Sequence, residues 1–190
     1  RKKYILEELK KFNINFIENN KFKSTDMLYS TYLGLKNLNN DDVLILYTDT
    51  YFSRNFIKWA CQIKKRDICI PISNIWQKIW KIRNKNLLDE GEELILDKKN
   101  FVMKIGQKLN DDIHKNQYMG VIFLPKSKLE YVKKTMKNCV KNKKKMHLTN
   151  YLQYLINNKV KIKGLVNNEF WYEIDDFEDF KNFKKRYEKN

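Results

Sequence analysis

Two carboxylates stand directly after segments with the composition of buried strands. Asp49 follows the apolar run Val43–Thr48, and Asp175 follows the aromatic segment Phe170–Ile174. Ligands of open α/β sheets sit at the carboxyl ends of strands, where a carboxylate must meet a cation or a donor to offset its desolvation. Asp49 is therefore either a metal ligand or a cap for a helix starting near Ser53, and Asp175 is either an N-cap or a second metal ligand. If the two approach each other, their like charges require a cation such as Mg²⁺ between them.

The three acids that follow Asp175 have a simpler interpretation. Asp176, Glu178 and Asp179 fall where the first turn of a helix is expected. Carboxylates in a first turn interact favourably with the positive end of the helix dipole. This acidic cluster stands out because the rest of the chain is strongly basic.

An aromatic and cationic stripe lies between these two segments. Trp76, Trp80 and Arg83 are spaced i, i+4 and i+7, so they share one face of a helix. The stripe is either a core face with a snorkelling Arg or the wall of a pocket for a phosphorylated or cationic small molecule. Burying two Trp and an Arg on one face is costly, which favours the pocket.

The elements that position these residues follow from the hydrophobic pattern, with turns marked by Asn and Asp because Gly (5) and Pro (2) are scarce. Helices are predicted over residues 4–12, 26–38, 53–64, 126–141, 148–157 and 176–187. Strands are predicted at Ile14–Ile17, Val43–Thr48, Ile68–Ile72, Leu94–Leu96, Phe101–Ile105, Tyr118–Leu124, Val160–Val166 and Phe170–Ile174. Val43–Thr48 is unbroken and predicts a strand buried on both faces. The alternation predicts a layered αβα fold with a mixed, mostly parallel central sheet.

Length and composition limit the function classes. The 190 residues, 42% of them hydrophobic, suffice for one domain with a real core. No apolar run approaches the roughly 18 residues of a membrane helix, and no signal peptide is evident, so a cytoplasmic protein is expected. The three cysteines form no C-x-x-C pair, and the two histidines have no partners at zinc spacing.

The net charge of +16 raises the alternative of a nucleic-acid-binding domain. Only 5 of the 39 basic residues are Arg, the residue favoured for base recognition and bidentate phosphate contacts. We therefore interpret most of the charge as solvated surface and expect no nucleic-acid partner.

Six segments in order resemble the Mg²⁺-dependent nucleotidyltransferase superfamily, in particular the small cytidylyltransferases that act on phosphocholine, phosphoglutamine and phosphonate substrates. The similar segments are "LILYTDTYF", the stretch from Trp76 to Glu92, Ile105-Gly106-Gln107-Lys108, Gln117-Tyr118-Met119-Gly120, "HLTNYLQYLI" and "WYEIDDFEDF". Their order and spacing agree with the family over essentially the whole chain.

The resemblance implies a function and a role for each matched residue. It implies transfer of CMP from CTP to a small phosphorylated polar substrate with release of pyrophosphate, which yields a CDP-activated precursor of a surface polysaccharide or phospholipid. Asp49 and Asp175 would hold the Mg²⁺ cofactor and, with Lys108, form the catalytic group. The nucleotide would contact Thr25, Asp26, Ser30 and Thr48. The acceptor side would comprise Trp76, Trp80, Arg83, Asp89, Glu92, Gln117, Tyr118 and Glu173.

The chain also departs from the family pattern. The Gly-rich triphosphate loop L-A-A-G-x-G-x-R with which the family begins has no counterpart, so residues 1–190 are expected to form one domain that lacks the first β-α units of the fold. Little turnover and an exposed strand edge are expected of these residues alone, and a homo-oligomer or a partner chain would be one way to complete the site. Thr48 also stands where Gly is usual, and Asn150 where Asp is usual. A non-catalytic remnant of the same fold remains an alternative.

Overall fold

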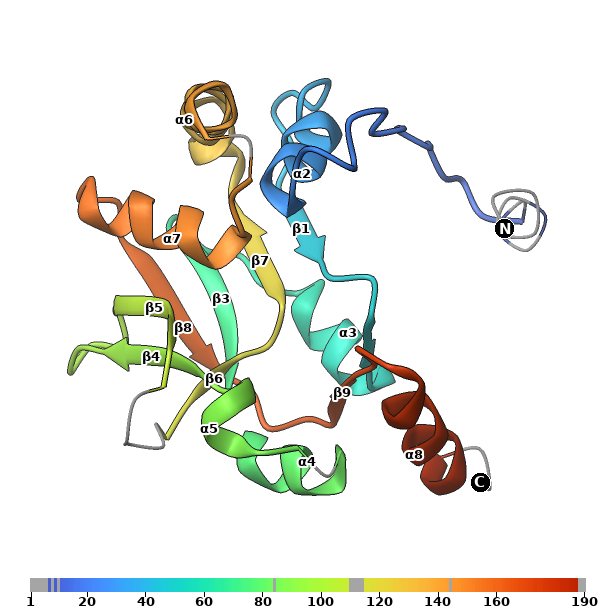
Figure 1. Ribbon diagram of the computed structural model, residues 1–190. Coiled ribbons are helices and arrows are strands. Elements are labelled where there is room, and N and C mark those ends of the chain that lie inside the picture. The colour runs from blue at the N-terminus through green and yellow to red at the C-terminus, as the bar shows by residue number, and fades with distance from the viewer. Residues whose placement is uncertain are drawn as a thin grey trace.

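A five-stranded sheet forms the centre of the molecule in a computed structural model that describes residues 7, 9, 11–83, 85–109, 115–143 and 145–187. The strands run in the order β1–β7–β3–β6, where β7 and β6 pair with successive parts of one edge of β3, and β8 pairs with the opposite edge of β3 (Figure 1). The strands of this sheet are β1 (Val43–Leu46), β3 (Ile68–Ser73), β6 (Gln117–Tyr118), β7 (Val121–Leu124) and β8 (Ile162–Val166).

The sheet is mixed, but the expected predominance of parallel pairs is wrong for the strands that the structure describes. β3 pairs in parallel with β8, whereas β7 runs antiparallel to both β1 and β3. β7 lies between β1 and β3 in the sheet although it follows both in sequence, and it runs in the opposite direction to both. The predicted strand Tyr118–Leu124 is split into β6 and β7 at Gly120, whose φ of 71° is a left-handed conformation that suits Gly.

Helices cover both faces of the sheet, which confirms the αβα layering. Ile68, Ile70 and Ile72 of β3 belong to one core cluster, which includes buried residues of α2, α6 and α7. Cys69, between them, belongs to a second cluster with residues of α3 and α4. Successive side chains of a strand point to opposite faces, so β3 separates the two cores. The helices are α2 (Met27–Leu35), α3 (Arg54–Ala60), α4 (Trp76–Arg83), α5 (Leu87–Glu90), α6 (Lys126–Asn142), α7 (Leu148–Asn157) and α8 (Phe177–Tyr187).

Two short ladders lie outside the central sheet. β4 (Glu92–Leu96) pairs with β5 (Val102–Lys108), and β2 (Thr50–Phe52) pairs with β9 (Trp171–Glu173), both antiparallel. The sequence pattern did not predict β2. Its pairing with β9 is nevertheless the connection that brings the segment after β1 next to the aromatic segment near the C-terminal end.

The N-terminal part differs from expectation. The predicted helix over residues 4–12 lies mostly outside the described residues, and the predicted strand Ile14–Ile17 is wrong, because residues 13–19 have no regular structure. This segment extends away from the sheet (Figure 1), and Phe12, Phe16 and Ile17 are each more than half exposed. An apolar segment forms a strand only where a neighbour offers hydrogen bonds and cover.

The prediction that β1 is buried on both faces is also wrong. Its first three residues are half-buried, and Leu46 is 38% exposed. Among the described strands β1 pairs with β7 alone, so it forms an edge of the sheet. The expectation of an exposed strand edge is confirmed for this part of the chain. Among the described residues, no helix has the length and apolar character needed to cross a membrane.

We predict that Gly106→Ala destabilises the fold while Gly34→Ala does not. Gly106 has a φ of 83°, and a Cβ there would lie 2.6 Å from Cβ of Thr149 on α7. Strain and overlap should lower the free energy of unfolding by about 1–3 kcal/mol in urea denaturation. Gly34 lies within α2 with open space around it, and Ala there should raise stability by about 0.5–1 kcal/mol. Equal effects at the two positions would contradict the prediction.

Candidate active site at the β2–β9 ladder

The β2–β9 ladder brings Asp49 and Asp175, the two candidate metal ligands, to one place. Thr50 faces Glu173 in the ladder, and the backbone N–H of Ile174 donates to the carbonyl oxygen of Asp49 at 2.8 Å. Asp175 follows directly. The side chains of Asp49 and Asp175 line the same cavity, which we call the acidic cavity and whose volume is about 250 Å³.

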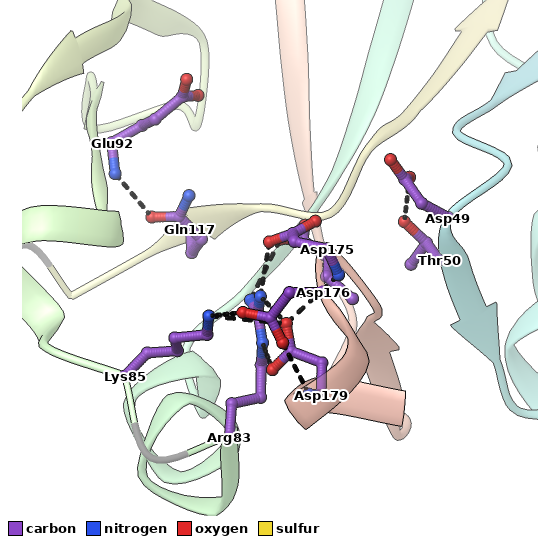
Figure 2. Close-up of polar contacts among 10 residues, drawn as sticks. Asp49, Thr50, Arg83, Lys85, Glu92, Gln117, Asp175, Asp176 and Asp179 are labelled. Atoms are coloured by element: carbon purple, nitrogen blue, oxygen red, sulfur yellow. Dashed lines mark hydrogen bonds and ion pairs between the residues drawn. The ribbon is translucent and has the colours of Figure 1, made fainter. Parts of the chain in front are cut away.

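Asp49 is not a helix cap. The N–H of Phe56 donates to Oγ of Ser53 at 3.1 Å, so Ser53 caps α3. Asp49 is exposed, and among the described residues its carboxylate accepts a single long hydrogen bond, from Oγ1 of Thr50 at 3.4 Å. Its oxygens are thus open to a ligand (Figure 2).

Asp175 is not a helix cap either. Oδ1 of Asp176 accepts from the N–H of Asp179 at 2.8 Å at the start of α8. The carboxylate of Asp175 instead accepts from Nη2 of Arg83 at 2.5 Å, and its side chain remains 45% exposed. Lys85 binds Asp176 at 2.6 Å on the outer side of the same cluster.

Arg83 and Trp76 are core residues, and the preference for a pocket wall is wrong for them. Trp76 is fully buried and Arg83 is 1% exposed. The α8 helix covers this face of α4, and Asp179 supplies a buried counter-ion, which removes the cost that made a core face implausible. Although burial opposes its charge, hydrogen bonds to Asp179 and Asp175 raise the pKa of Arg83. Trp80, 1% exposed, still lines the acidic cavity.

A second cavity of about 420 Å³ adjoins the first, and we call it the α2 cavity because residues of α2 and its N-cap line it. All four residues expected to contact the nucleotide lie in its wall: Thr25, Asp26, Ser30 and Thr48. Asp26 also caps α2 by accepting from the N–H of Met27 at 2.7 Å. Asp49, Tyr47 and Met27 line both cavities, so Asp49 stands at their junction.

The acidic cavity contains part of the expected acceptor side. Four expected residues line it in addition to Trp80: Glu92, Gln117, Tyr118 and Glu173. Gln117 is 5% exposed, and its Oε1 accepts from the N–H of Glu92 at 3.2 Å. Nε1 of Trp80 and the hydroxyl of Tyr118 are buried, and no geometrically satisfactory hydrogen bond to them is found among the described residues.

Two further expected residues, besides Trp76 and Arg83, line neither cavity. Asp89 is exposed on α5, and the neighbouring Glu90 lines the acidic cavity in its place. Lys108 is exposed at the end of β5, opposite Glu92 in the β4–β5 ladder.

Further residues that the sequence did not single out line the acidic cavity, namely Glu90, Tyr47, Met27, His147 and Thr149. His147 and Thr149 flank the start of α7, and the recognisable segment "HLTNYLQYLI" was the available signal for them.

Burial raises the pKa values of two carboxyl groups that line the acidic cavity, those of Glu173 and Glu92. Burial raises the pKa of Glu173 to about 8; Arg83 opposes this shift, and the carboxylate of Asp175 adds to it. Asp49 and Glu92 also raise this pKa, which places their charges within electrostatic reach of Glu173. Burial likewise raises the pKa of Glu92.

The donor set at the junction fits a Mg²⁺ ion. Asp49 and Asp175 offer hard oxygen ligands that are not consumed by capping. The described residues contain no cluster of three or more acidic, His or Cys ligands with metal-site geometry. Mg²⁺ typically takes only one or two carboxylates and completes its shell with waters and substrate phosphates, so two carboxylates at a nucleotide cavity suffice.

No family model matches this chain. The curated CTP:phosphoglutamine cytidylyltransferase of Campylobacter jejuni is 26% identical over 182 residues, which cover 88% of this chain and 71% of that protein.

Solved structures also match. The CTP:phosphocholine cytidylyltransferase of Streptococcus pneumoniae superposes with a TM-score of 0.71 at 14% identity, over 97% of this chain and 73% of that one. The chain has the nucleotidyltransferase fold. The inositol-1-phosphate CTP transferase of T. maritima matches this fold with a TM-score of 0.68 at 19% identity, over 94% of this chain and 66% of that one. The resemblance to the cytidylyltransferase branch is confirmed, and the chain spans about two thirds to three quarters of these relatives.

We predict that Glu173 makes the stability of this nucleotidyltransferase fold fall with rising pH. Its folded pKa of about 8 lies above the unfolded value near 4.5, so the folded state binds the extra proton between these values. Stability is therefore lost as the pH rises towards 8. Glu173→Gln mimics the neutral form, so its melting temperature should increasingly exceed that of the parent between about pH 5 and 8 in metal-free buffer, and the difference should level off above that range.

The matched control is Glu178→Gln, because Glu178 is exposed on the first turn of α8. Its melting temperature should differ from that of the parent by the same amount at each pH. A difference for Glu173→Gln that does not grow with pH would show that this carboxyl titrates normally.

Proposed function

We propose that this chain is a cytidylyltransferase-like domain that transfers CMP from CTP to a small phosphorylated polar acceptor. The position of Asp49 carries the proposal. Its carboxylate stands at the junction of the α2 cavity and the acidic cavity, with Asp175 in the wall of the latter. Such a junction is where the α-phosphate of a nucleotide would meet an acceptor phosphate.

The chain's residues divide the binding work between the two cavities. The α2 cavity would take the nucleoside, with the hydroxyls and carboxylate of Thr25, Ser30 and Asp26 as hydrogen-bonding groups. Asp49 and Asp175 would hold Mg²⁺, which when bound offsets the negative charge on the reacting phosphates. The acidic cavity would take the body of the acceptor and hold it against the nucleotide.

The proposed reaction is a nucleotidyl transfer in which no oxidation state changes. A phosphate oxygen of the acceptor attacks the α-phosphorus and forms the new P–O bond. The bond from the α-phosphorus to the bridging oxygen of the β-phosphate breaks, and its electron pair leaves with pyrophosphate. This chain's contribution is to align attacking and leaving groups and to exclude water.

The lining of the acidic cavity favours an acceptor that carries an ammonium group. Glu90, Glu92 and Glu173 line it together with Asp49 and Asp175, while His147 is its one basic lining residue among the described residues. A cation would offset the negative charge of the ionised carboxylates among them. The named relatives act on phosphocholine, phosphoglutamine and inositol-1-phosphate, and of these phosphocholine carries a permanent positive charge.

Turnover by residues 1–190 alone should be low. Among the described residues that line the two cavities there is no Lys or Arg. A triphosphate carries several negative charges that a single Mg²⁺ does not balance, so cationic groups from outside these cavities are required. We therefore expect residues 1–190 to bind the nucleotide but not to catalyse its transfer efficiently.

A thermal-shift titration tests the proposed function. The chain is heated with Mg²⁺ and each of CTP, UTP, ATP, GTP and dTTP, with a short RNA as comparator. CTP with Mg²⁺ should raise the melting temperature by several degrees, and Asp49→Asn should abolish the shift. Asp41→Asn is the control, because Asp41 is exposed and lies in neither cavity. Stabilisation by RNA with no response to any triphosphate would refute the proposal.

A panel of acceptors tests the charge preference of the acidic cavity. In the presence of Mg²⁺ and a non-hydrolysable CTP analogue, phosphocholine and phosphoethanolamine should stabilise the chain more than inositol-1-phosphate does. Glu92→Gln removes one of the lining charges and should reduce this difference. Equal stabilisation by acceptors with and without an ammonium group would count against an ammonium-binding cavity.

A further inference from the structure

The guanidinium of Arg83 is the centre of a buried network of carboxylates. Nε donates to Oδ1 of Asp179 at 3.0 Å and Nη2 donates to Oδ2 of Asp179 at 2.9 Å, which is a bidentate pair. Nη2 also donates to Oδ2 of Asp175 at 2.5 Å (Figure 2). Nη1 donates to Oε2 of Glu173 at 3.3 Å. One side chain of α4 thus contacts three carboxylates that come from β9, α8 and the turn between them.

The side of this network that faces the core is rigid. The side chains of Arg83 and Asp179 are both fully buried. The guanidinium carbon lies 4.8 Å from the ring centroid of Trp80, and Oδ2 of Asp179 also accepts from the backbone N–H of Asp175 at 3.2 Å. A planar guanidinium held by two parallel hydrogen bonds has little freedom to turn.

The side that faces the acidic cavity is open. Asp175 uses Oδ2 to accept from Arg83, and within the described residues its Oδ1 accepts no hydrogen bond. Its side chain is 45% exposed and lines the cavity shared with Asp49. Arg83 therefore fixes the direction of the carboxylate while leaving one of its oxygens for another partner.

Electrostatics make this arrangement dependent on Arg83. Glu173, Asp175 and Asp179 bring three carboxyl groups around one positive charge, and Asp49 faces the same cavity. Without Arg83 the carboxylates would repel one another, and Asp179 would be buried with Lys85, at 3.8 Å, as its one ion-pair partner among the described residues. The carboxylate of Asp175 would then lose its fixed direction.

We propose that Arg83 is a positioning residue that holds the carboxylate of Asp175 in place for the divalent cation, with Asp179 as the buried anchor. This inference rests on the proposed function, because it takes Asp49 and Asp175 as the cation ligands. Hydrogen-bonded partners of metal-ligating carboxylates orient the ligands, and their substitution typically costs about 10–100-fold in metal affinity.

Mn²⁺ binding, measured by electron paramagnetic resonance in the presence of CTP, tests the proposal without any need for turnover. The unsubstituted chain should bind Mn²⁺, and Asp49→Asn and Asp175→Asn should abolish this binding. Arg83→Lys keeps the charge but lacks the fork that reaches Asp179 and Asp175 together, so the dissociation constant should rise about 10-fold or more. Asp179→Asn weakens the anchor and should act in the same direction.

Lys85→Gln is the matched control. It removes one positive charge from the same cluster, but Lys85 binds Asp176 rather than Asp175. Its Mn²⁺ dissociation constant should stay within about threefold of that of the unsubstituted chain, well short of the change expected for a ligand-orienting group. Melting temperatures are recorded for every variant, and affinities are compared where all are folded.

The outcomes separate this inference from the proposed function. If Asp49→Asn and Asp175→Asn abolish binding while Arg83→Lys and Asp179→Asn lower only the melting temperature, Arg83 is structural and the inference is overturned, but the proposed function stands. If the unsubstituted chain binds no Mn²⁺, or if Asp49→Asn leaves binding intact, both fail together.

Discussion

The pairing of β2 with β9 is the interaction on which the candidate site depends. Asp49 and Asp175 are far apart in sequence: Asp49 directly precedes β2, and Asp175 lies just after the end of β9. The hydrogen bond from the Ile174 N–H to the Asp49 carbonyl fixes the two strand ends side by side. The carboxylates are then placed by the backbone, so their proximity does not depend on long, mobile side chains. Two carboxylates of like charge are thus held near one another by backbone hydrogen bonds, without help from their side chains.

The buried Arg83 network extends the same constraint into the core. Removing an Arg and an Asp from water is expensive, and the attraction between them repays that cost only with good geometry and full hydrogen bonding. The bidentate contact to Asp179 supplies this geometry. The network also joins α4 to α8, so it links the wall of the acidic cavity to the loop that carries Asp175.

The sequence predicted the layers and most elements because the apolar runs of β3, β7 and β8 and the amphipathic α6 and α7 are strong local signals. The sequence also indicated Asp49 and Asp175 as candidate metal ligands, since a lone acid after an apolar run is a local feature. It could not predict that Arg83 is buried. The spacing of Trp76, Trp80 and Arg83 defines a helix face, but the residue that neutralises this face, Asp179, is 96 positions later in sequence. The strand Thr50–Phe52 was missed because three residues carry too little periodicity, and Ile14–Ile17 was wrong because its apolar pattern has no neighbouring strand to pair with among the described residues.

The cavities and the outer surface of this molecule have opposite charge. The chain carries +16 overall, yet the described walls of both cavities hold carboxylates and no Lys or Arg. At distances of a Debye length, about 8 Å at physiological ionic strength, an approaching polyphosphate feels the positive surface and is drawn in. At contact it meets a negative wall, which only a cation carried in with it can neutralise. Under the proposed function, encounter and capture would thus be controlled by different charges. Added salt would slow arrival at the surface, and the supply of divalent cation would set how long the nucleotide stays.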